Sequence, residues 1–228
     1  MANLTAMSVP AWLEWIRLRL ALRRERRFWR RRVLRQGAAA VLHKEHGPAA
    51  LAEVTARQKA ELLPLLRAEL SGNERVALDF GCGAGRFTPD LARTIGGWAI
   101  GVDPIEALLQ LAPPAPAVEY RAYHPPRLPV ESDSVDVVWI ACVLCNITAP
   151  AMLRNAASEI DRVLRPGGLL FLIENTADKP PAPHVRYRSG AEYRALFPTI
   201  ALRHVRDHDE MGERVSVLAG RKRETADG

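Results

Sequence analysis

The stretch Val76-Ala77-Leu78-Asp79-Phe80-Gly81-Cys82-Gly83-Ala84-Gly85-Arg86-Phe87-Thr88 decides the fold. It begins as a short apolar run typical of a buried strand, passes through three alternate glycines and continues into a predicted helix. Glycine lets a backbone approach a ligand closely because it has no Cβ atom. A strand that turns through glycines into a helix N-terminus also presents unpaired N–H groups to a bound molecule. The stretch therefore predicts a ligand site at a strand end of an α/β sheet.

The spacing of the glycines distinguishes a dinucleotide site from a site for another kind of ligand. A dinucleotide fingerprint needs Gly-x-Gly-x-x-Gly, and its third position would fall on Arg86. The sequence instead reads Asp-x-Gly-x-Gly-x-Gly, with Asp79 at the end of the strand. A carboxylate there suits a ligand with an ammonium group and repels a pyrophosphate. The pattern resembles the first motif of class I S-adenosylmethionine-dependent methyltransferases.

Two later phrases carry the same resemblance. Glu159-Ile160-Asp161-Arg162-Val163-Leu164-Arg165-Pro166-Gly167-Gly168-Leu169-Leu170 is very similar to the late motif of the family. Leu128-Pro129-Val130, an acidic turn and Val135-Asp136-Val137-Val138 resemble its middle motif, with valines where phenylalanine is usual. The resemblance runs from about Val76 to Arg221. It implies a Rossmann-like, doubly wound seven-stranded sheet with the last strand antiparallel, preceded by N-terminal helices, and an enzyme that uses S-adenosylmethionine.

An acidic residue ends the second predicted strand. Asp103 lies 18 positions after Gly85, close to the ~20-residue spacing expected for a carboxylate that binds ribose hydroxyls. It also suits the N-cap of a helix that begins at Pro104, and both roles can hold together. The resemblance implies a cofactor site made of Asp79, Gly81, Cys82, Gly83, Gly85 and Asp103, with Pro104 beside the adenine and Ile140 on the ridge beside the methyl group.

Two candidate site positions also depart from the family pattern. His124 falls where an aspartate often contacts the adenine amino group. Its imidazole either accepts a hydrogen bond from that amine, faces the substrate as a base, or lies on the surface of a proline-rich loop. Asn146 stands where many relatives carry histidine, which suits the orientation of a substrate hydroxyl and makes a poor base.

The loop from Glu174 to Gly190 is the candidate for substrate contact, because it follows a central strand at the sheet edge where α/β folds bind ligands. Its His184 and Tyr187, together with His124, are candidate bases for an acceptor hydroxyl. The alternative is a surface connector with solvated basic residues. The resemblance implies a small-molecule or glycan acceptor. The short substrate region and the basic N-terminal helix favour a sugar or lipid-linked acceptor, and we expect O-methylation. A non-catalytic cofactor-binding scaffold and a nicotinamide-dependent reductase remain as alternatives from other classes.

The cysteines bear on metal binding and on the compartment. Three cysteines fit no disulfide framework and favour a reducing, cytoplasmic location. Cys142-x-x-Cys145 has no second cysteine pair to complete a zinc site, so we read both as small apolar fillers and expect no metal. The longest apolar run, Val137 to Cys145, is far shorter than the ~20 residues that cross a membrane.

The net charge of +6 is concentrated in one segment. Between Glu14 and Arg35 there are ten arginines and two glutamates, a local charge of +8, so the remaining residues carry −2. We expect a helix over residues 11–35 whose apolar residues recur at helical spacing. This stripe consists of Trp15, Leu18, Leu22, Trp29 and Val33.

The role of this basic helix is open on sequence alone. It either docks on the main domain with a solvated basic face, or lies on an anionic membrane surface with tryptophans at the interface. The core domain lacks the aromatic–basic interleaving of nucleic-acid binders, and acidic residues count against an organellar transit peptide. Gly47-Pro48 separates a helical extension, residues 1–48, from a methyltransferase domain, residues 49–228. We expect removal of residues 1–35 to leave cofactor binding intact.

Overall fold

The chain folds as one seven-stranded sheet with helices on both faces. The computed structural model describes residues 11–43 and 45–224, and the side chains of residues 11–15, 17 and 18 lie outside this description. Trp15 and Leu18 of the expected apolar stripe are among these. The strands are β1 (Val76–Phe80), β2 (Trp98–Asp103), β3 (Val118–Ala122), β4 (Val135–Ala141), β5 (Leu164–Asn175), β6 (Arg203–Glu210) and β7 (Glu213–Arg221). Their order is β3-β2-β1-β4-β5-β7-β6, with β7 antiparallel to both neighbours, which confirms the expected fold.

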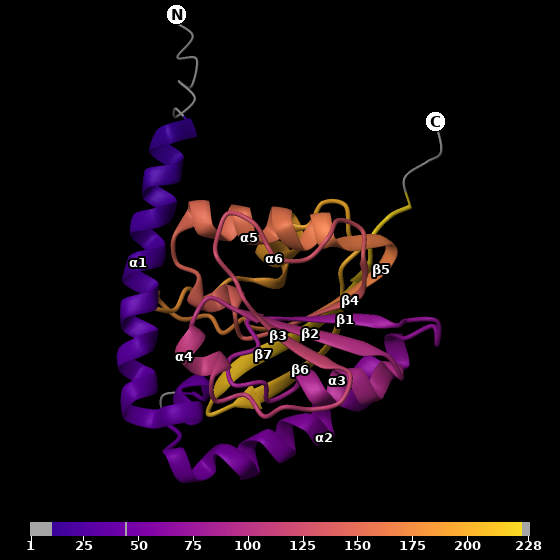
Figure 1. Ribbon diagram of the computed structural model, residues 1–228, viewed down its shortest axis with the longest axis horizontal. Coiled ribbons are helices and arrows are strands. Elements are labelled where there is room, and N and C mark those ends of the chain that lie inside the picture. Colours follow the sequence, from indigo (N-terminus) through magenta and orange to yellow (C-terminus); the bar gives the residue numbers. More distant parts are fainter. Residues whose placement is uncertain (1–10, 44, 225–228) are drawn as a thin grey trace, which may run out of the picture.

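The helices form two layers, one on each face of the sheet, and one long helix runs across both layers. They are α1 (Ala11–Gln36), α2 (Leu51–Glu69), α3 (Thr88–Ile95), α4 (Glu106–Leu109), α5 (Pro150–Val163) and α6 (Gly190–Leu196), with short 3-10 turns η1 (Gly37–Val41), η2 (Pro48–Ala50) and η3 (Leu144–Asn146). Figure 1 shows α5 and α6 over one face of the sheet, α2 and α3 under the other, and α1 standing along one side across the layers. The long basic helix therefore runs beside the sheet and belongs to the folded body.

The central strands are buried on both faces, which explains their nearly continuous apolar sequences. On the α3 side, Trp139 of β4 stacks on Phe171 of β5 with ring centroids 5.2 Å apart, and Phe87 packs against it at 5.3 Å. On the α5 side, Ile160 packs with Leu78 in a second cluster. This double packing fixes the strand ends, from which the loops of the site emerge.

Three boundaries differ from the sequence expectation. The apolar and alternating residues of 199–205 predict the first strand of a terminal hairpin, but this strand begins at Arg203, and its exposed polar residues give no apolar signal. Met211 and Gly212 form its turn with φ of +56° and +75°, the backbone of a two-residue type I′ connection. Helix α4 begins at Glu106, two residues after Pro104. The sequence Arg165-Pro166-Gly167-Gly168 predicts a tight turn after the preceding helix, but β5 starts at Leu164, directly after α5, and includes these residues.

Candidate functional site

The glycine loop after β1 turns tightly beneath the N-terminal segment. The N–H groups of Gly81 and Cys82 both donate to the carbonyl oxygen of Val102, at 2.8 and 3.1 Å. Gly83 has φ of +56°, and a Cβ atom there would lie 2.7 Å from Cγ1 of Val41. Only glycine satisfies both the left-handed backbone and this close approach. The loop is therefore a backbone cradle covered by the residues that follow α1.

Asp103 fixes this cradle from the neighbouring strand. Its Oδ2 accepts from the N–H of Gly83 at 3.0 Å, and its Oδ1 accepts from the N–H of Ile105 at 2.8 Å. It is not the N-cap of α4, a position that Ile105 holds. Burial raises the pKa of Asp103 to about 6. Each carboxylate oxygen keeps a further lone pair, so the group can still accept from ribose hydroxyls.

Asp79 lies deeper, where β1 meets α3. The hydroxyl of Thr88 donates to its Oδ2 at 2.6 Å, and the carboxyl group is almost fully buried. Burial raises its pKa to about 7, against the lowering effects of the Thr88 hydrogen bond and of the Arg86 charge. Asp79 and Asp103 therefore give the cavity two acids that titrate near neutral pH.

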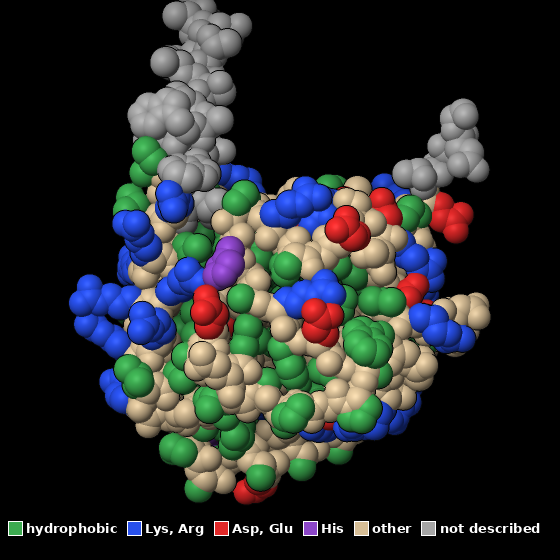
Figure 2. Space-filling model, in the orientation of Figure 1, with side chains coloured by type: hydrophobic (Ala, Val, Ile, Leu, Met, Phe, Trp, Pro, Cys, Tyr) green, Lys and Arg blue, Asp and Glu red, His purple; other side chains and the backbone are tan. Residues whose placement is uncertain are grey.

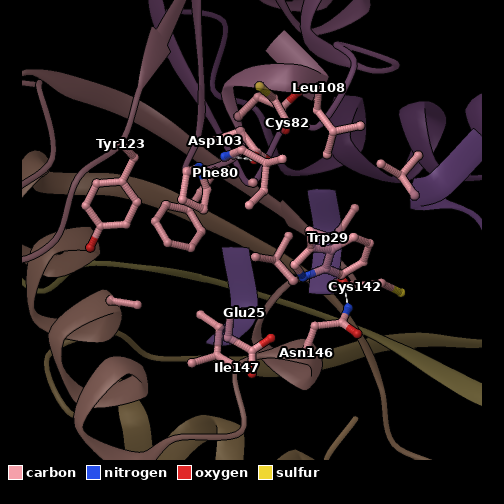
Figure 3. Close-up of a pocket in the computed structure, with 18 of the residues that line it drawn as sticks. Glu25, Trp29, Phe80, Cys82, Asp103, Leu108, Tyr123, Cys142, Asn146 and Ile147 are labelled. Carbon is pink, nitrogen blue, oxygen red and sulfur yellow. Dashed lines mark hydrogen bonds between the residues drawn. The ribbon is translucent and has the colours of Figure 1, made fainter. Parts of the chain in front are cut away.

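These residues border a cavity of about 1150 Å³, counting the space open at its mouth. Of the predicted cofactor residues, its lining contains Asp79, Gly81, Cys82, Asp103 and Pro104. Figure 3 shows Asp103, Cys82 and Leu108 toward one end, and Asn146, Ile147 and Glu25 toward the other. The cradle and the acid thus fit the nucleoside end of S-adenosylmethionine.

The other predicted cofactor residues lie outside the lining. Gly83 and Gly85 are part of the loop but do not line the cavity. A Cβ atom at Gly85 would lie 2.3 Å from the hydroxyl oxygen of Tyr120. Ile140 is fully buried in the core and does not line the cavity, contrary to its expected place, whereas Ala141 and Cys142 do line it. Strand alternation explains the error, because successive side chains point to opposite faces.

Helix α1 forms one wall of this cavity, a role that sequence reasoning missed. Among the described side chains of α1, those of Leu22, Glu25, Arg26 and Trp29 line it. Arg26 donates from Nε to the carbonyl oxygen of Pro104 at 3.1 Å, and its Nη2 lies 2.9 Å from Nδ1 of His124. The His124 ring is exposed at the rim and held against α1, so the lining holds its neighbours Tyr123 and Pro125 instead. The sequence held a signal for this buried face of α1, since Leu22 and Trp29 belong to its apolar stripe and Glu25 and Arg26 lie between them at helical spacing.

A second cavity of about 1710 Å³ adjoins the first. It lies among α1, η1, α2, the loop of residues 176–189 and the β6–β7 hairpin, and its lining includes both His184 and Tyr187. The residues that line both cavities are Trp29, Val41, Arg86, Phe87, Ala141, Cys142 and Asn146. Cys142 is exposed toward these cavities with φ of +54°, so the reading as a core filler holds for buried Cys145 alone.

A buried carboxylate holds the segment between the two cavities. Glu174, at the end of β5, accepts from the N–H groups of Val143, Leu144 and Cys145 at 2.9, 2.6 and 2.9 Å. Burial raises its pKa, and these backbone hydrogen bonds oppose that rise. The carboxylate thus caps η3 and fixes Asn146 at the junction. Sequence reasoning missed this role, although an acid at the end of an apolar strand was a signal.

The second cavity is rimmed by two hydrogen-bonded glutamates. Glu213 accepts from the hydroxyl of Tyr187 at 3.1 Å and from Nζ of Lys179 at 3.0 Å, with Nε2 of His43 3.8 Å away. Glu210 pairs with His46 and Arg57 at 2.9 and 3.0 Å.

Within residues 11–43 and 45–224, no three His, Cys, Asp or Glu side chains are grouped to hold a metal ion. Across the same residues, no helix has both the length and the apolarity to cross a bilayer.

Known proteins share this fold and sequence pattern. Residues 78–172 match the methyltransferase domain family. An uncharacterised methyltransferase-like protein of Schizosaccharomyces pombe is 36% identical over 104 residues, 45% of this chain and 39% of the relative. A thiol S-methyltransferase of Rattus norvegicus is 31% identical over 155 residues, 59% of this chain and 60% of the relative.

A solved structure extends the likeness of the fold to most of the chain. Phosphoethanolamine N-methyltransferase 1 of Haemonchus contortus, in complex with phosphoethanolamine and S-adenosylhomocysteine, aligns with a TM-score of 0.65 at 17% identity, over 92% of this chain and 51% of that one. The chain spans about two fifths to three fifths of the length of the curated relatives named above, so the likeness concerns the domain. Residues 78–172 therefore match a methyltransferase domain, and the chain has the Rossmann-like fold of S-adenosylmethionine-dependent methyltransferases.

Proposed function

We propose that the protein transfers a methyl group from S-adenosylmethionine in the first cavity to a small-molecule, sugar or lipid-linked acceptor in the second. The observation that carries the proposal is the shared wall of the two cavities at Cys142 and Asn146. The first cavity has a glycine cradle and a ribose-type carboxylate, and the second has apolar walls with a hydrogen-bonding rim. Such a rim suits an acceptor with both polar and apolar parts.

The chain's own part in this reaction is mainly alignment. A sulfonium methyl group is already an activated electrophile. The residues at the junction therefore have to hold the acceptor atom in line behind it, and such positioning supplies on the order of 7–11 kcal/mol of barrier lowering. Asn146 suits this task because its Nδ2 donates to the carbonyl oxygen of Cys142 at 2.7 Å, which fixes the side chain. Its amide oxygen is an acceptor for a substrate hydroxyl or thiol.

The acceptor atom we favour is a hydroxyl oxygen, and a thiol sulfur is the second candidate. The hydroxyl suits the sugar or lipid-linked acceptor and the hydrogen-bonding rim of the second cavity. The thiol is supported by the rat relative, whose name assigns it S-methylation and which matches over more than half of both chains. Both acceptors require removal of a proton, so a base is needed in either case.

Label transfer tests the proposed function directly. The full-length protein is incubated with methyl-tritiated S-adenosylmethionine and separate panels of sugars, lipid extracts and small thiols. We expect label in one panel and inhibition by S-adenosylhomocysteine. A protein that binds S-adenosylhomocysteine but labels nothing would support the scaffold alternative, and one that binds NADH in its place would support the reductase.

We also propose that the outer face of α1 contacts an anionic membrane at its cytoplasmic side. Arg23, Arg27, Arg30 and Arg31 are exposed on this face, and exposed Leu20 accompanies them. Figure 2 shows Lys and Arg side chains gathered along the α1 side of the molecule. Trp29 faces the opposite way, so the proposed contact rests on arginines, at roughly 1 kcal/mol for each one near the surface.

A further inference from the structure

Glu25 is the one acidic residue that the described part of α1 turns into the site. Its side chain is nine-tenths buried and lines the first cavity near Asn146 (Figure 3). Its Oε1 accepts a 3.4 Å hydrogen bond from the hydroxyl of Thr148, while its Oε2 has no hydrogen-bond partner among the described residues. A buried carboxylate oxygen without a partner is costly to the fold. On a helix rich in arginine, an inward-facing acid therefore calls for a functional explanation.

The group that faces this oxygen is the imidazole of His184. Its Nδ1 lies 3.8 Å from Oε2 of Glu25 and is also buried without a hydrogen-bond partner among the described residues. The ring stacks on Phe28 of α1, with centroids 3.6 Å apart and planes inclined by 15°. The stacking sets the plane of the ring, so Glu25 and His184 are poised to pair through one hydrogen bond. Catalytic hydrogen bonds are often this long before the substrate is bound.

The loop that carries His184 is anchored to the junction of the two cavities. Arg188 is buried and donates to the carbonyl oxygens of Leu144 and Ile147, at 2.8 and 2.9 Å. The N–H of Arg186 donates to the carbonyl oxygen of Cys145 at 2.8 Å. These bonds tie the loop to the segment that lines both cavities. His184 lines the second cavity, so its imidazole reaches the acceptor side while Glu25 reaches the cofactor side.

We propose that Glu25 and His184 form the carboxylate–imidazole pair that deprotonates the acceptor, an inference that rests on the proposed function. Nε2 of His184 takes the proton of the acceptor O–H or S–H, and Glu25 stabilises the resulting imidazolium through Nδ1–H. The electron pair of that O–H or S–H bond forms the new bond to the methyl carbon. The methyl–sulfur bond breaks with its pair left on sulfur, so the products are the methylated acceptor, S-adenosylhomocysteine and protonated His184. In this scheme His184 is a catalytic residue and Glu25 a positioning residue.

The other candidate bases are already engaged. The Tyr187 hydroxyl donates to Glu213, and His43 has Nδ1 near the N–H of Glu45 and Nε2 toward Glu213. His124 is held at the rim by Arg26. Of these imidazoles and hydroxyls, only His184 combines a buried unpartnered nitrogen with a carboxylate facing it. The geometry therefore favours His184 over the other two predicted bases.

The pair has a spectroscopic signature that needs no acceptor. In the full-length protein with bound S-adenosylhomocysteine, we expect one histidine ring N–H proton far downfield in the NMR spectrum, as a carboxylate-bonded imidazole gives. The resonance should be lost in Glu25→Gln and in His184→Gln. It should persist in Asp207→Asn, which removes the acid partner of exposed His204 at 2.8 Å. A spectrum that Glu25→Gln leaves unchanged would overturn the proposal.

Kinetics separate deprotonation from cofactor binding. The acceptor is benzyl mercaptan if the thiol panel takes the label and benzyl alcohol if a hydroxyl panel does. With either acceptor, Glu25→Gln should lower kcat about a hundredfold. With the more acidic 4-nitrothiophenol or 4-nitrophenol it should approach the wild-type rate, because little deprotonation is then required. Its affinity for S-adenosylhomocysteine should stay within about threefold of wild type.

Two results contradict the pair as a base. One is an equal loss of rate for acceptors of high and low acidity. The other is a loss of S-adenosylhomocysteine affinity with an unchanged kcat at saturation, which would make Glu25 a cofactor ligand. A wild-type protein that binds no S-adenosylhomocysteine would contradict the proposed function itself, so the two failures are distinguishable.

Discussion

At the scale of single residues, Asp103 joins the glycine cradle to the predicted ribose site. Its two oxygens accept from Gly83 and Ile105. In Asp103→Asn, one oxygen becomes an NH₂ group that faces a backbone donor, so both the cradle and the ribose contact are impaired. We expect affinity for S-adenosylhomocysteine to fall at least about tenfold, or about 1.4 kcal/mol, by isothermal titration.

A matched control exists at the amino-terminal end of the central strand β4. Asp136 also accepts from two backbone N–H groups, those of Arg75 and Val76 at 2.8 and 2.7 Å, but lies away from both cavities. Asp136→Asn should lower the melting temperature without changing affinity. If the two variants lose affinity equally, the effect of Asp103 is one of stability alone.

The two buried acids make cofactor binding depend on pH. Burial raises the pKa of Asp103 to about 6 and that of Asp79 to about 7. Charged carboxylates accept hydroxyls and pair with an ammonium group better than neutral ones, so the bound nucleoside should lower both pKa values. The affinity for S-adenosylhomocysteine should therefore be highest above about pH 7 and should fall as the pH drops through about 6. Between these two pH values, binding should release protons. Titrations in buffers of different ionisation enthalpy measure this release, and a pH-independent affinity without it would contradict the assignment.

At the scale of elements, α1 acts as a cover over the first cavity. Arg26 bonds it to the carbonyl oxygen of Pro104 and to His124, on the far side of the cavity mouth. Arg26→Ala removes a charged donor, a loss of roughly 1.5–3 kcal/mol. We expect S-adenosylhomocysteine to dissociate at least about tenfold faster in stopped-flow measurements. Arg27→Ala, on the exposed face one residue along, is the control, and equal rates in both variants would show that α1 does not restrain the ligand.

How well each element could be predicted depends on where its side chains lie. Buried parallel strands such as β1 and β4 are nearly continuous apolar runs, and Gly81 marks the end of β1, so both strands could be located from sequence. Edge strand β6 exposes polar residues along most of its length, and its turn uses Met211, which is no turn signal. The docking of α1 depends on shape complementarity with α4 and η1, which no local pattern encodes.

At the scale of the whole molecule, the basic helix links a charged surface to the site. We expect the full-length protein to sediment with vesicles that contain phosphatidylserine. Replacing Arg23, Arg27, Arg30 and Arg31 with glutamine should abolish this, since roughly 4 kcal/mol of attraction is removed. S-adenosylhomocysteine binding should persist, because none of the four lines the first cavity. Two results would contradict the membrane proposal. One is equal sedimentation of the wild-type and the substituted protein, and the other is wild-type sedimentation that is as strong with neutral vesicles as with anionic ones.

The cavity-lining residues of the glycine motif and Asp103 could be identified from sequence, but the position of α1 over them could not. The apolar stripe of α1 indicates that one face of the helix is buried and does not indicate what that face packs against. The motif around Gly81 and the spacing to Asp103 rest on residues adjacent in sequence or on neighbouring strands. Glu25 and Trp29 reach the cavity from an element about 50 residues before the motif. The expectation that residues 1–35 are dispensable for cofactor binding therefore gives way to a new one. Their removal should weaken binding, because it removes one wall of the cavity.

The crystal structure of the full-length protein with S-adenosylhomocysteine tests the central claim most directly. We predict the ribose hydroxyls on Asp103, the adenine beside Ile105 and Leu108, and the sulfur directed toward Cys142 and Asn146 beneath α1. Density for the nucleoside elsewhere, or a cavity filled by side chains with the ligand absent, would contradict the account.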